Sequence, residues 1–173
     1  MKIIKRLLCP LAVILVLFLA GACGYQFSGL QKNPFGVHRF HVAVFENKTM
    51  EIGAEVLFAN DLMNELTRDG RLRLTPALEA EGLFTGVIKL MDIETVARKD
   101  GYAATERRVK LTVDMELKDP AGRILWVGKN ITASETYLVV PEKPGTEYNR
   151  KIAVAKVSKK IAQKVFQQLN WNF

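Results

Sequence analysis

The stretch LFTGVIKLMDIETVARKDGYAATERRVKLTVDMELK, residues 83–118, decides the fold of this chain. Both halves of the stretch alternate apolar with polar residues, which is the pattern of half-buried strands. The pair Asp100-Gly101 between them is a strong signal for the two-residue turn of a β-hairpin. The sequence therefore predicts one long hairpin with strands at residues 83–98 and 103–118.

Placing Asp100-Gly101 at the tip fixes the register, because Lys99 then lies opposite Tyr102. Apolar residues meet on one face in this register: Phe84 with Leu117, Ile88 with Val113, and Leu90 with Leu111. The same register also predicts polar pairs: Glu94 with Arg107, Thr95 with Glu106, and Lys89 with Thr112. A one-residue slip would turn every apolar side chain to the wrong face. We therefore expect an amphipathic base and a largely polar tip half that projects beyond the core.

The segments on either side of the hairpin supply three more strands and two helices. Strands are expected at residues 39–45, 71–75 and 123–137, with Gly128 as a candidate bulge. A helix is expected at residues 51–69, with Thr49 as its N-cap and Gly70 ending it. A second helix is expected at residues 149–169, after a loop at 141–149 that contains Pro141, Pro144 and Gly145.

The apolar residues of each predicted helix recur at three- and four-residue spacing, so each helix has one apolar face. These residues are Ile52, Val56, Ala59, Leu62, Met63 and Leu66 in the first helix, and Val154, Val157, Ile161, Val165 and Leu169 in the second. The fold class that follows is α+β: a single domain whose four- to five-stranded, mostly antiparallel sheet is packed by two helices. With both helices on one face, the other face of the sheet meets water or a partner.

The N-terminus has the three parts of a secretory signal peptide. Lys2, Lys5 and Arg6 precede an apolar run at residues 7–19, and small residues at 20–22 come directly before Cys23. The apolar run is short for a membrane span, which needs about 20 residues. We expect a leader at residues 1–22 to be removed, and Cys23 to carry covalent lipid, although Ala20 stands where lipoprotein signals usually have leucine.

The predicted organisation is therefore a signal peptide at 1–22, a lipidated tether at 23–38 and a single α+β domain at 39–173. A plain secreted protein is the alternative, but it would leave Cys23 as an unpaired thiol. No cofactor is expected other than the covalent lipid on Cys23. Loss of the leader lowers the net charge from +7 to about +4.

The residues that could carry catalysis or bind a metal are few. His38 and His41 are the only histidines, and their spacing on an extended segment directs them to opposite faces. Glu79 and Glu81 show no sign of a paired-carboxylate site. Because no nucleophile set or phosphate-binding glycine motif is present either, the sequence favours a protein that is not an enzyme and predicts no metal site.

Basic residues gather in two places. Residues 149–173 hold Arg150, Lys151, Lys156, Lys159, Lys160 and Lys164 and no acid, and Lys156 to Lys164 lie on one helix face. That face is either simply solvated or attracts a polyanion, and for an exported chain an anionic lipid or glycolipid is favoured over nucleic acid.

The second basic cluster lies at the hairpin tip, with Arg98 and Lys99 next to Tyr102 and with Arg107 and Arg108 further down. It is either a binding feature or an exposed turn whose charges discourage strand-edge association. Lys143 in the loop before the last helix is a third, weaker candidate.

Several stretches resemble the lipopolysaccharide-assembly lipoproteins of the LptE-like family. They are Cys23-Gly24-Tyr25-Gln26-Phe27, the stretch VAVFENKT at 42–49, Glu106-Arg107-Arg108-Val109, Leu125-Trp126, Tyr137 and the Lys- and Ala-containing terminal helix. The resemblance covers nearly all of the chain after the leader.

This resemblance implies an outer-membrane lipoprotein subunit of the lipopolysaccharide translocon. Such a subunit plugs a large outer-membrane β-barrel assembly protein, supports the assembly of that barrel and binds lipopolysaccharide during delivery to the outer leaflet. It implies lipopolysaccharide-binding residues at the positions of Arg98 or Lys99, and at Lys143, where the match is looser. Gly24, in place of an inner-membrane retention aspartate, implies the outer membrane, with the domain facing the periplasm or within the barrel lumen.

Two alternative functions are also compatible with the sequence. The chain could be a structural or sensory envelope lipoprotein that holds anionic lipid headgroups with Lys156, Lys159, Lys160 and Lys164, without a barrel partner. An envelope hydrolase ranks last, because the sequence offers no nucleophile set.

Overall fold

The computed structural model describes residues 35–68, 70–100 and 103–171, with side chains described as far as Leu169. The predicted signal peptide, Cys23 and most of the tether lie outside these residues. At the end of the predicted tether, Val37 is already buried in the core.

The described elements follow one another as two short strands, a helix, a short strand with a 3₁₀ turn, three long strands and a final helix. They are β1 (Arg39–Val42), β2 (Glu46–Asn47), α2 (Ala54–Thr67), β3 (Arg73–Leu74), η1 (Ala77–Glu79), β4 (Gly82–Lys99), β5 (Ala103–Lys118), β6 (Ile124–Leu138) and α3 (Lys143–Trp171). The strands form one sheet in the order β3-β1-β4-β5-β6, and β2 pairs with β4.

The sheet is mixed, although its two long pairings are antiparallel as predicted. β4, β5 and β6 form an antiparallel meander, whereas β1 pairs in parallel with β3 and β4, and β2 pairs in parallel with β4. The α+β class, the single domain and the two helices are as predicted. The parallel part escaped prediction because its strands have only two to four residues, too few for a periodic pattern.

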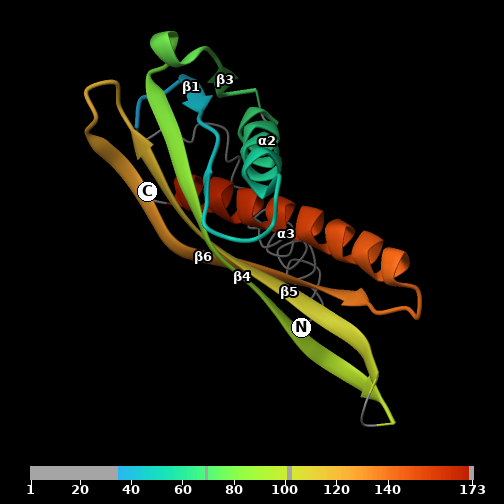
Figure 1. Cartoon of the computed structure of the whole chain (residues 1–173). Helices are drawn as coiled ribbons and strands as arrows, with labels where there is room; N and C mark the ends of the chain where they lie inside the picture. Colours follow the sequence, from blue (N-terminus) through green and yellow to red (C-terminus); the bar gives the residue numbers. More distant parts are fainter. Residues whose placement is uncertain (1–34, 69, 101–102, 172–173) are drawn as a thin grey trace, which may run out of the picture. The chain divides into compact units, whose positions relative to one another are not determined.

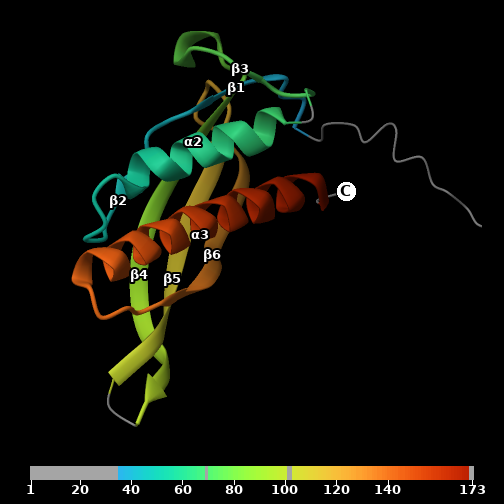
Figure 2. The same ribbon diagram turned by 90° about the vertical axis from the view of Figure 1, so that its right-hand side faces the viewer.

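Both helices lie on one face of the sheet, with α2 beside α3 (Figures 1 and 2). The core fills the space between the two layers. It takes alternate residues from each long strand, such as Phe84, Ile88, Leu111 and Leu117, and the inner stripes of the helices. The predicted apolar face of the last helix is confirmed, since Val154, Val157, Ile161, Val165 and Leu169 are all buried.

The segment before α2 differs from the prediction. β1 ends at Val42, and β2 follows as a separate pair of residues. Thr49 is not an N-cap: it donates its backbone N–H and its hydroxyl to Asn47 Oδ1 at 2.9 and 2.7 Å. The helix begins only at Ala54, after Gly53 with φ +88°, a conformation that glycine adopts at little cost.

The later start moves the buried stripe of α2. Phe58, Ala59, Leu62 and Leu66 are buried, while Ile52 lies outside the helix and is 96% exposed. Val56 is exposed as well. The predicted stripe was therefore right at its C-terminal half and wrong at its start, where Asn47 and Thr49 hold the chain in a turn.

The predicted register of the hairpin is confirmed in its base and wrong beyond it. Phe84 pairs with Leu117 and Ile88 with Val113, but a bulge at Lys89 then shifts the ladder. Leu90 therefore pairs with Thr112 instead of Leu111, and Met91 takes the place opposite Leu111. The other predicted pairs beyond the bulge shift too: Glu94 pairs with Arg108, Thr95 with Arg107 and Ala97 with Glu106.

The long strand predicted at residues 123–137 is confirmed, and a tight turn precedes it. Gly122, with φ +81°, donates its N–H to the Asp119 carbonyl at 2.9 Å, and β6 runs from Ile124 to Leu138. The bulge expected at Gly128 falls just after it, where the pairing skips between Met115–Gly128 and Val113–Ile131.

The predicted loop at 141–149 is largely helical, because α3 begins at Lys143. Pro144 is compatible with a first helical turn, where its missing N–H would have no partner in any case. The Thr146 hydroxyl joins this turn to the end of β6: it donates to the Val140 carbonyl and accepts from the Val140 N–H, both at 3.0 Å. Lys143 therefore starts a helix instead of lying in a loop.

Candidate binding surfaces

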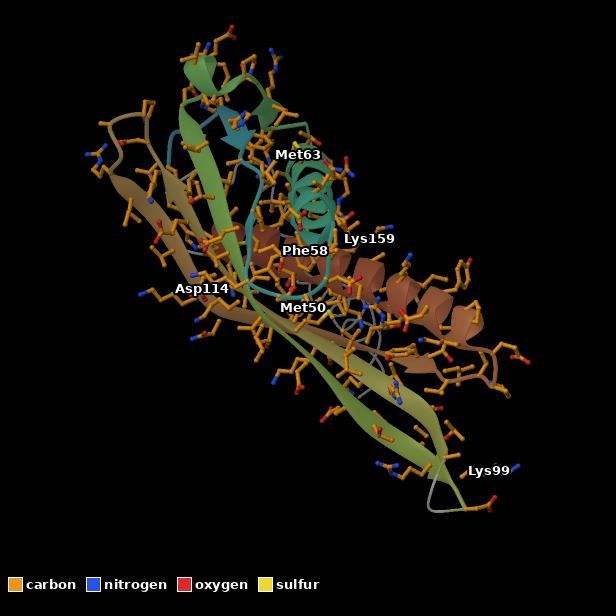
Figure 3. The ribbon with its side chains drawn as sticks, viewed as in Figure 1. Met50, Phe58, Met63, Lys99, Asp114 and Lys159 are labelled. Carbon is orange, nitrogen blue, oxygen red and sulfur yellow. The ribbon has the colours of Figure 1, made fainter. Side chains whose placement is uncertain are left out.

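The tip of the β4–β5 hairpin carries the first pair of predicted site residues. Arg98 and Lys99 are exposed and pair with Ala104 and Ala103 at the end of the ladder. Lys99 lies at the far end of the projecting hairpin (Figure 3). Asp100 has φ +50°, in keeping with a tight turn, while Tyr102 lies outside the described residues. The exposure predicted for this tip is confirmed for its two described cations.

Two further arginines lie on β5 away from the tip. Arg108 forms an ion pair with Glu94 across the strands, between Nη1 and Oε1 at 2.9 Å. Arg107 pairs in the ladder with Thr95 on one side and Tyr137 on the other. Both are half-buried. They belong to the body of the hairpin, so Arg98 and Lys99 are the cations that the tip itself presents.

Lys143 lies at the same end of the sheet as the tip. β6 ends beside Glu106 of β5, through the pair Glu106–Leu138, and the chain then enters α3 at Lys143. The hairpin ladder continues beyond Glu106 to Ala103. Lys143 is exposed, so three predicted site residues share one end of the molecule, although they come from two different elements.

Three lysines of α3 are bound to β6. Glu135 lies between Lys156 and Lys160, with Oε–Nζ distances of 3.0 and 2.6 Å. The ammonium groups of Lys160 and then Lys156 lower the pKa of the Glu135 carboxyl, against the opposing effect of burial. Lys164 donates to the Thr132 carbonyl at 2.5 Å. Lys159 points into solvent on the far side of the helix (Figure 3).

A groove of about 460 Å³ follows the same side of α3, lined by Lys110, Thr132, Ala133, Ser134, Lys160, Gln163, Lys164 and Gln167. Two of its three lysines already hold β6. These contacts give Lys156, Lys160 and Lys164 a use within the fold, so the geometry does not favour the hypothesis that this helix face holds lipid headgroups.

A polar junction at the middle of the sheet was missed at the level of sequence. Asp114 of β5 accepts the Asn130 N–H at 2.6 Å and forms an ion pair with Lys89 at 3.1 Å. The Asn130 N–H, followed by the Lys89 ammonium group, lowers the pKa of Asp114. Lys89 and Asn130 lie at the bulges of β4 and β6, so Asp114 joins two irregularities on either side of β5 (Figure 3). Only the proximity of Gly128 hinted at it.

A second polar contact links the two helices. Ser158 of α3 is buried and donates its hydroxyl to Asp61 Oδ2 of α2 at 2.5 Å. Arg150 of α3 forms an ion pair with Glu51, in the turn before α2. These contacts fix α2 against α3.

Within the described ranges, no cluster of three His, Cys, Asp or Glu residues could hold a metal ion. His41 contacts the Thr75 carbonyl through Nδ1 at 3.1 Å, and His38 is exposed. No helix in this part of the chain is both long and apolar enough to cross a membrane.

The fold and these surfaces define a small α+β domain, with a helix-covered mixed sheet and a projecting hairpin that ends in cations. The family model LptE, described as lipopolysaccharide-assembly, matches residues 37–169. The chain therefore belongs to the LptE family, a non-catalytic family of lipoproteins.

Three lipoproteins of known structure share this fold at low sequence identity. One from Nitrosomonas europaea, lipoprotein B, has 12% identity and a TM-score of 0.56, covering 85% of this chain and 90% of that one. One from Caulobacter crescentus has 19% identity and a TM-score of 0.51, covering 73% and 88%. The rare lipoprotein B of Shewanella oneidensis has 13% identity and a TM-score of 0.50, covering 75% and 92%. No curated protein matches the sequence.

Proposed function

We propose that this chain is the outer-membrane lipoprotein subunit of a lipopolysaccharide translocon. In this role it plugs a large β-barrel partner, supports the assembly of that barrel and binds lipopolysaccharide on its way to the outer leaflet. The observation that carries the proposal is membership of the LptE family over residues 37–169. The enzymatic alternative gains no support from the described side chains.

The anchor in this proposal is Cys23, exposed as the first residue once the leader at 1–22 is removed. Acyl chains contribute about 0.8 kcal/mol per buried methylene, so two or more chains hold a domain firmly on a membrane. Gly24 after the cysteine favours the outer membrane. No cofactor beyond this lipid belongs to the proposal.

The glycolipid site in this proposal is the cationic end of the molecule, with Arg98 and Lys99 at the hairpin tip and Lys143 at the start of α3. Arginine and lysine form charge-assisted hydrogen bonds with phosphate oxygens. The exposure of all three side chains and their common end of the sheet support this assignment.

The partner is tested by affinity purification of the full-length, lipidated chain from detergent-solubilised envelopes, with mass spectrometry of the proteins recovered. We expect a large outer-membrane barrel in near-equal amount. A Cys23→Ala chain is the control for the anchor and should leave the membrane fraction. Recovery of the chain alone, or with lipid only, would contradict the barrel-plug proposal and favour the lipid-headgroup alternative.

The glycolipid site is tested by charge reversal at the tip, with Arg98→Glu and Lys99→Glu combined. Lipopolysaccharide binding by the purified chain should fall by about tenfold, equivalent to about 1.4 kcal/mol, because two phosphate-binding cations become repulsive. Lys143→Glu should lower binding less.

The matched control combines Lys129→Glu with Lys159→Glu, which alters the net charge equally at exposed positions away from the tip. Equal losses in the two double variants would show that overall charge, and not the tip, governs binding.

A further inference from the structure

The two outer edges of the antiparallel meander differ in how far other elements cover them. The outer edge of β6 is covered by α3, whose side chains donate to its carbonyls: Lys164 to Thr132, Lys160 to Ser134 and Asn149 to Leu138, at 2.5, 3.1 and 3.0 Å. Such cover blunts an edge strand, which would otherwise be a template for another chain.

The opposite edge belongs to β4 and is covered only in part. β1 and β2 pair with its first half, and the last backbone bond on that side runs from the Lys48 N–H to the Ile88 carbonyl at 2.9 Å. Beyond Ile88, β4 has β5 on one side and no described strand on the other (Figures 1 and 2). Among the residues that the structure describes, the outer edge of this second half therefore has no neighbouring strand, and we call it open.

Two bulges set the length of the usable part of that edge. The β4–β5 ladder is irregular at Lys89 and again at Val96, but it runs without interruption from the pair Leu90–Thr112 to the pair Thr95–Arg107. The regular edge is thus Leu90–Thr95, which we call the open slot. Its six residues match the commonest strand length in globular proteins, about five or six.

The direction of the backbone groups in the open slot follows from alternation along the strands. Thr132 and Ser134 direct their carbonyls to the outer edge of β6. Because backbone groups alternate in direction along an antiparallel strand, the residues next to these two on β6 bond to Val113 and Leu111 of β5. The alternate β5 residues then bond to β4, and they pair with Leu90, Asp92 and Glu94. The backbone N–H and C=O groups of Met91, Ile93 and Thr95 are left directed outward.

The side chains of the open slot are also only partly used. On the helix side of the sheet, Ile93 is 39% exposed, and on the opposite side Leu90 is 57% exposed. Glu94 is paired with Arg108, but the Asp92 carboxylate has no hydrogen-bond or ion-pair partner in the described part of the chain. A strand laid along the slot would cover both apolar side chains and lie next to the Asp92 carboxylate, which faces Lys110 across the β4–β5 ladder but forms no ion pair with it.

A second copy of this chain is a poor occupant of the slot. In a symmetric antiparallel pair, opposed side chains must point to the same face, so only even registers are allowed. The two even registers with the longest overlap place Asp92 opposite Asp92 or opposite Glu94, and like charges directly opposite each other destabilise the pair. The slot instead fits a chain with Lys or Arg at that position.

We propose that the open slot Leu90–Thr95 binds an extended strand of a partner protein by β-addition. The strand bonds to the outward backbone groups of Met91, Ile93 and Thr95, sets a basic residue opposite Asp92 and sets apolar residues beside Leu90 and Ile93. This inference rests on the proposed function only in requiring a protein partner.

The test uses the full-length lipidated chain in its own envelope and compares Ile93→Pro with Ile93→Thr. Proline removes the outward N–H of residue 93 but no bond to β5, a position where edge strands tolerate proline. Threonine keeps the N–H and the β-branched shape. We expect recovery of the partner protein to fall by about tenfold for Ile93→Pro and by less than about threefold for Ile93→Thr. Full recovery with a folded Ile93→Pro chain would overturn the inference.

A second measurement covers the case in which Ile93→Pro fails to fold. A photoreactive p-benzoyl-phenylalanine in place of Thr95 should cross-link to one extended, basic segment of the partner, whereas the same group in place of Thr136 on β6 should not. Co-purification of the partner without an adduct at Thr95, or an adduct only to a second copy of this chain, would overturn the inference.

The two proposals fail separately. A barrel that co-purifies but ignores both changes in the slot contradicts the inference alone. A Thr95 adduct with another protein, in the absence of any barrel, contradicts the proposed function alone.

Discussion

The two halves of β4 belong to one continuous strand but have different surroundings. In the base, from Gly82 to Ile88, every second residue is buried beneath the helices, and β1 and β2 cover the outer edge. Beyond Lys89, the strand keeps its bonds to β5 but loses the helices and the outer neighbours, so most of its residues are exposed. Alternation of apolar and polar residues alone therefore does not make a core, because burial also needs a second layer packed on the sheet. The base therefore supports the fold, and the distal half is available for binding.

The largest expected effect separates two isoleucines of the same strand. Ile88→Ala should destabilise the protein by about 2–5 kcal/mol, because Ile88 is fully buried. Ile93→Ala should cost less than about 1 kcal/mol, because Ile93 is 39% exposed and its removal leaves no closed cavity. Urea unfolding followed by circular dichroism measures both. Equal losses of stability for the two variants would show that the distal half is part of the core.

A smaller effect is expected at Gly128, on β6 beside the base. A Cβ at this position would lie 2.4 Å from Trp126 Cη2 and 2.7 Å from Ile131 Cδ1, so Gly128→Ala should cost about 1–3 kcal/mol through overpacking. Thermal unfolding and the tryptophan fluorescence spectrum report the displacement. Ala104→Gly on the distal half of β5 is the contrasting change and should cost about 1 kcal/mol or less. A larger loss of stability for Ala104→Gly than for Gly128→Ala would contradict the view that the distal half is the less tightly packed one.

The smallest effect concerns Asp114, at the junction between the two halves. Because its pKa is lowered in the fold, this carboxylate adds stability above its usual pKa, and that stability is lost as the pH falls through the lowered value. Asp114→Asn should therefore flatten the dependence of stability on pH below about pH 4. Asp92→Asn, an exposed carboxylate on the same face, is the matched control. An unchanged acid-unfolding curve for Asp114→Asn would show that the Asp114 carboxylate does not contribute to the dependence of stability on pH.

The candidate site was predictable where it depends on local pattern. The turn signal Asp100-Gly101 and the cations before it were enough to expect Arg98 and Lys99 at an exposed tip. The open slot was hidden, because Leu90 followed Ile88 in apparent alternation and the sequence paired it with Leu111. The only available signal was length: the hairpin strands are longer than the short strands before them, so one edge must lack a neighbour.

The sequence by itself determined the α+β class, the hairpin, the register of its base and the apolar face of the last helix. These follow from periodicity and turn chemistry, which act over a few residues. Three features depend on the tertiary structure: the parallel pairing of the short strands, the bulge at Lys89 and the contacts of the α3 lysines with β6. Each of these depends on partners distant in the chain: Lys89 meets Asp114 and Asn130, and Lys160 meets Glu135. No local pattern contains such contacts, since they exist only once the strands and helices have packed.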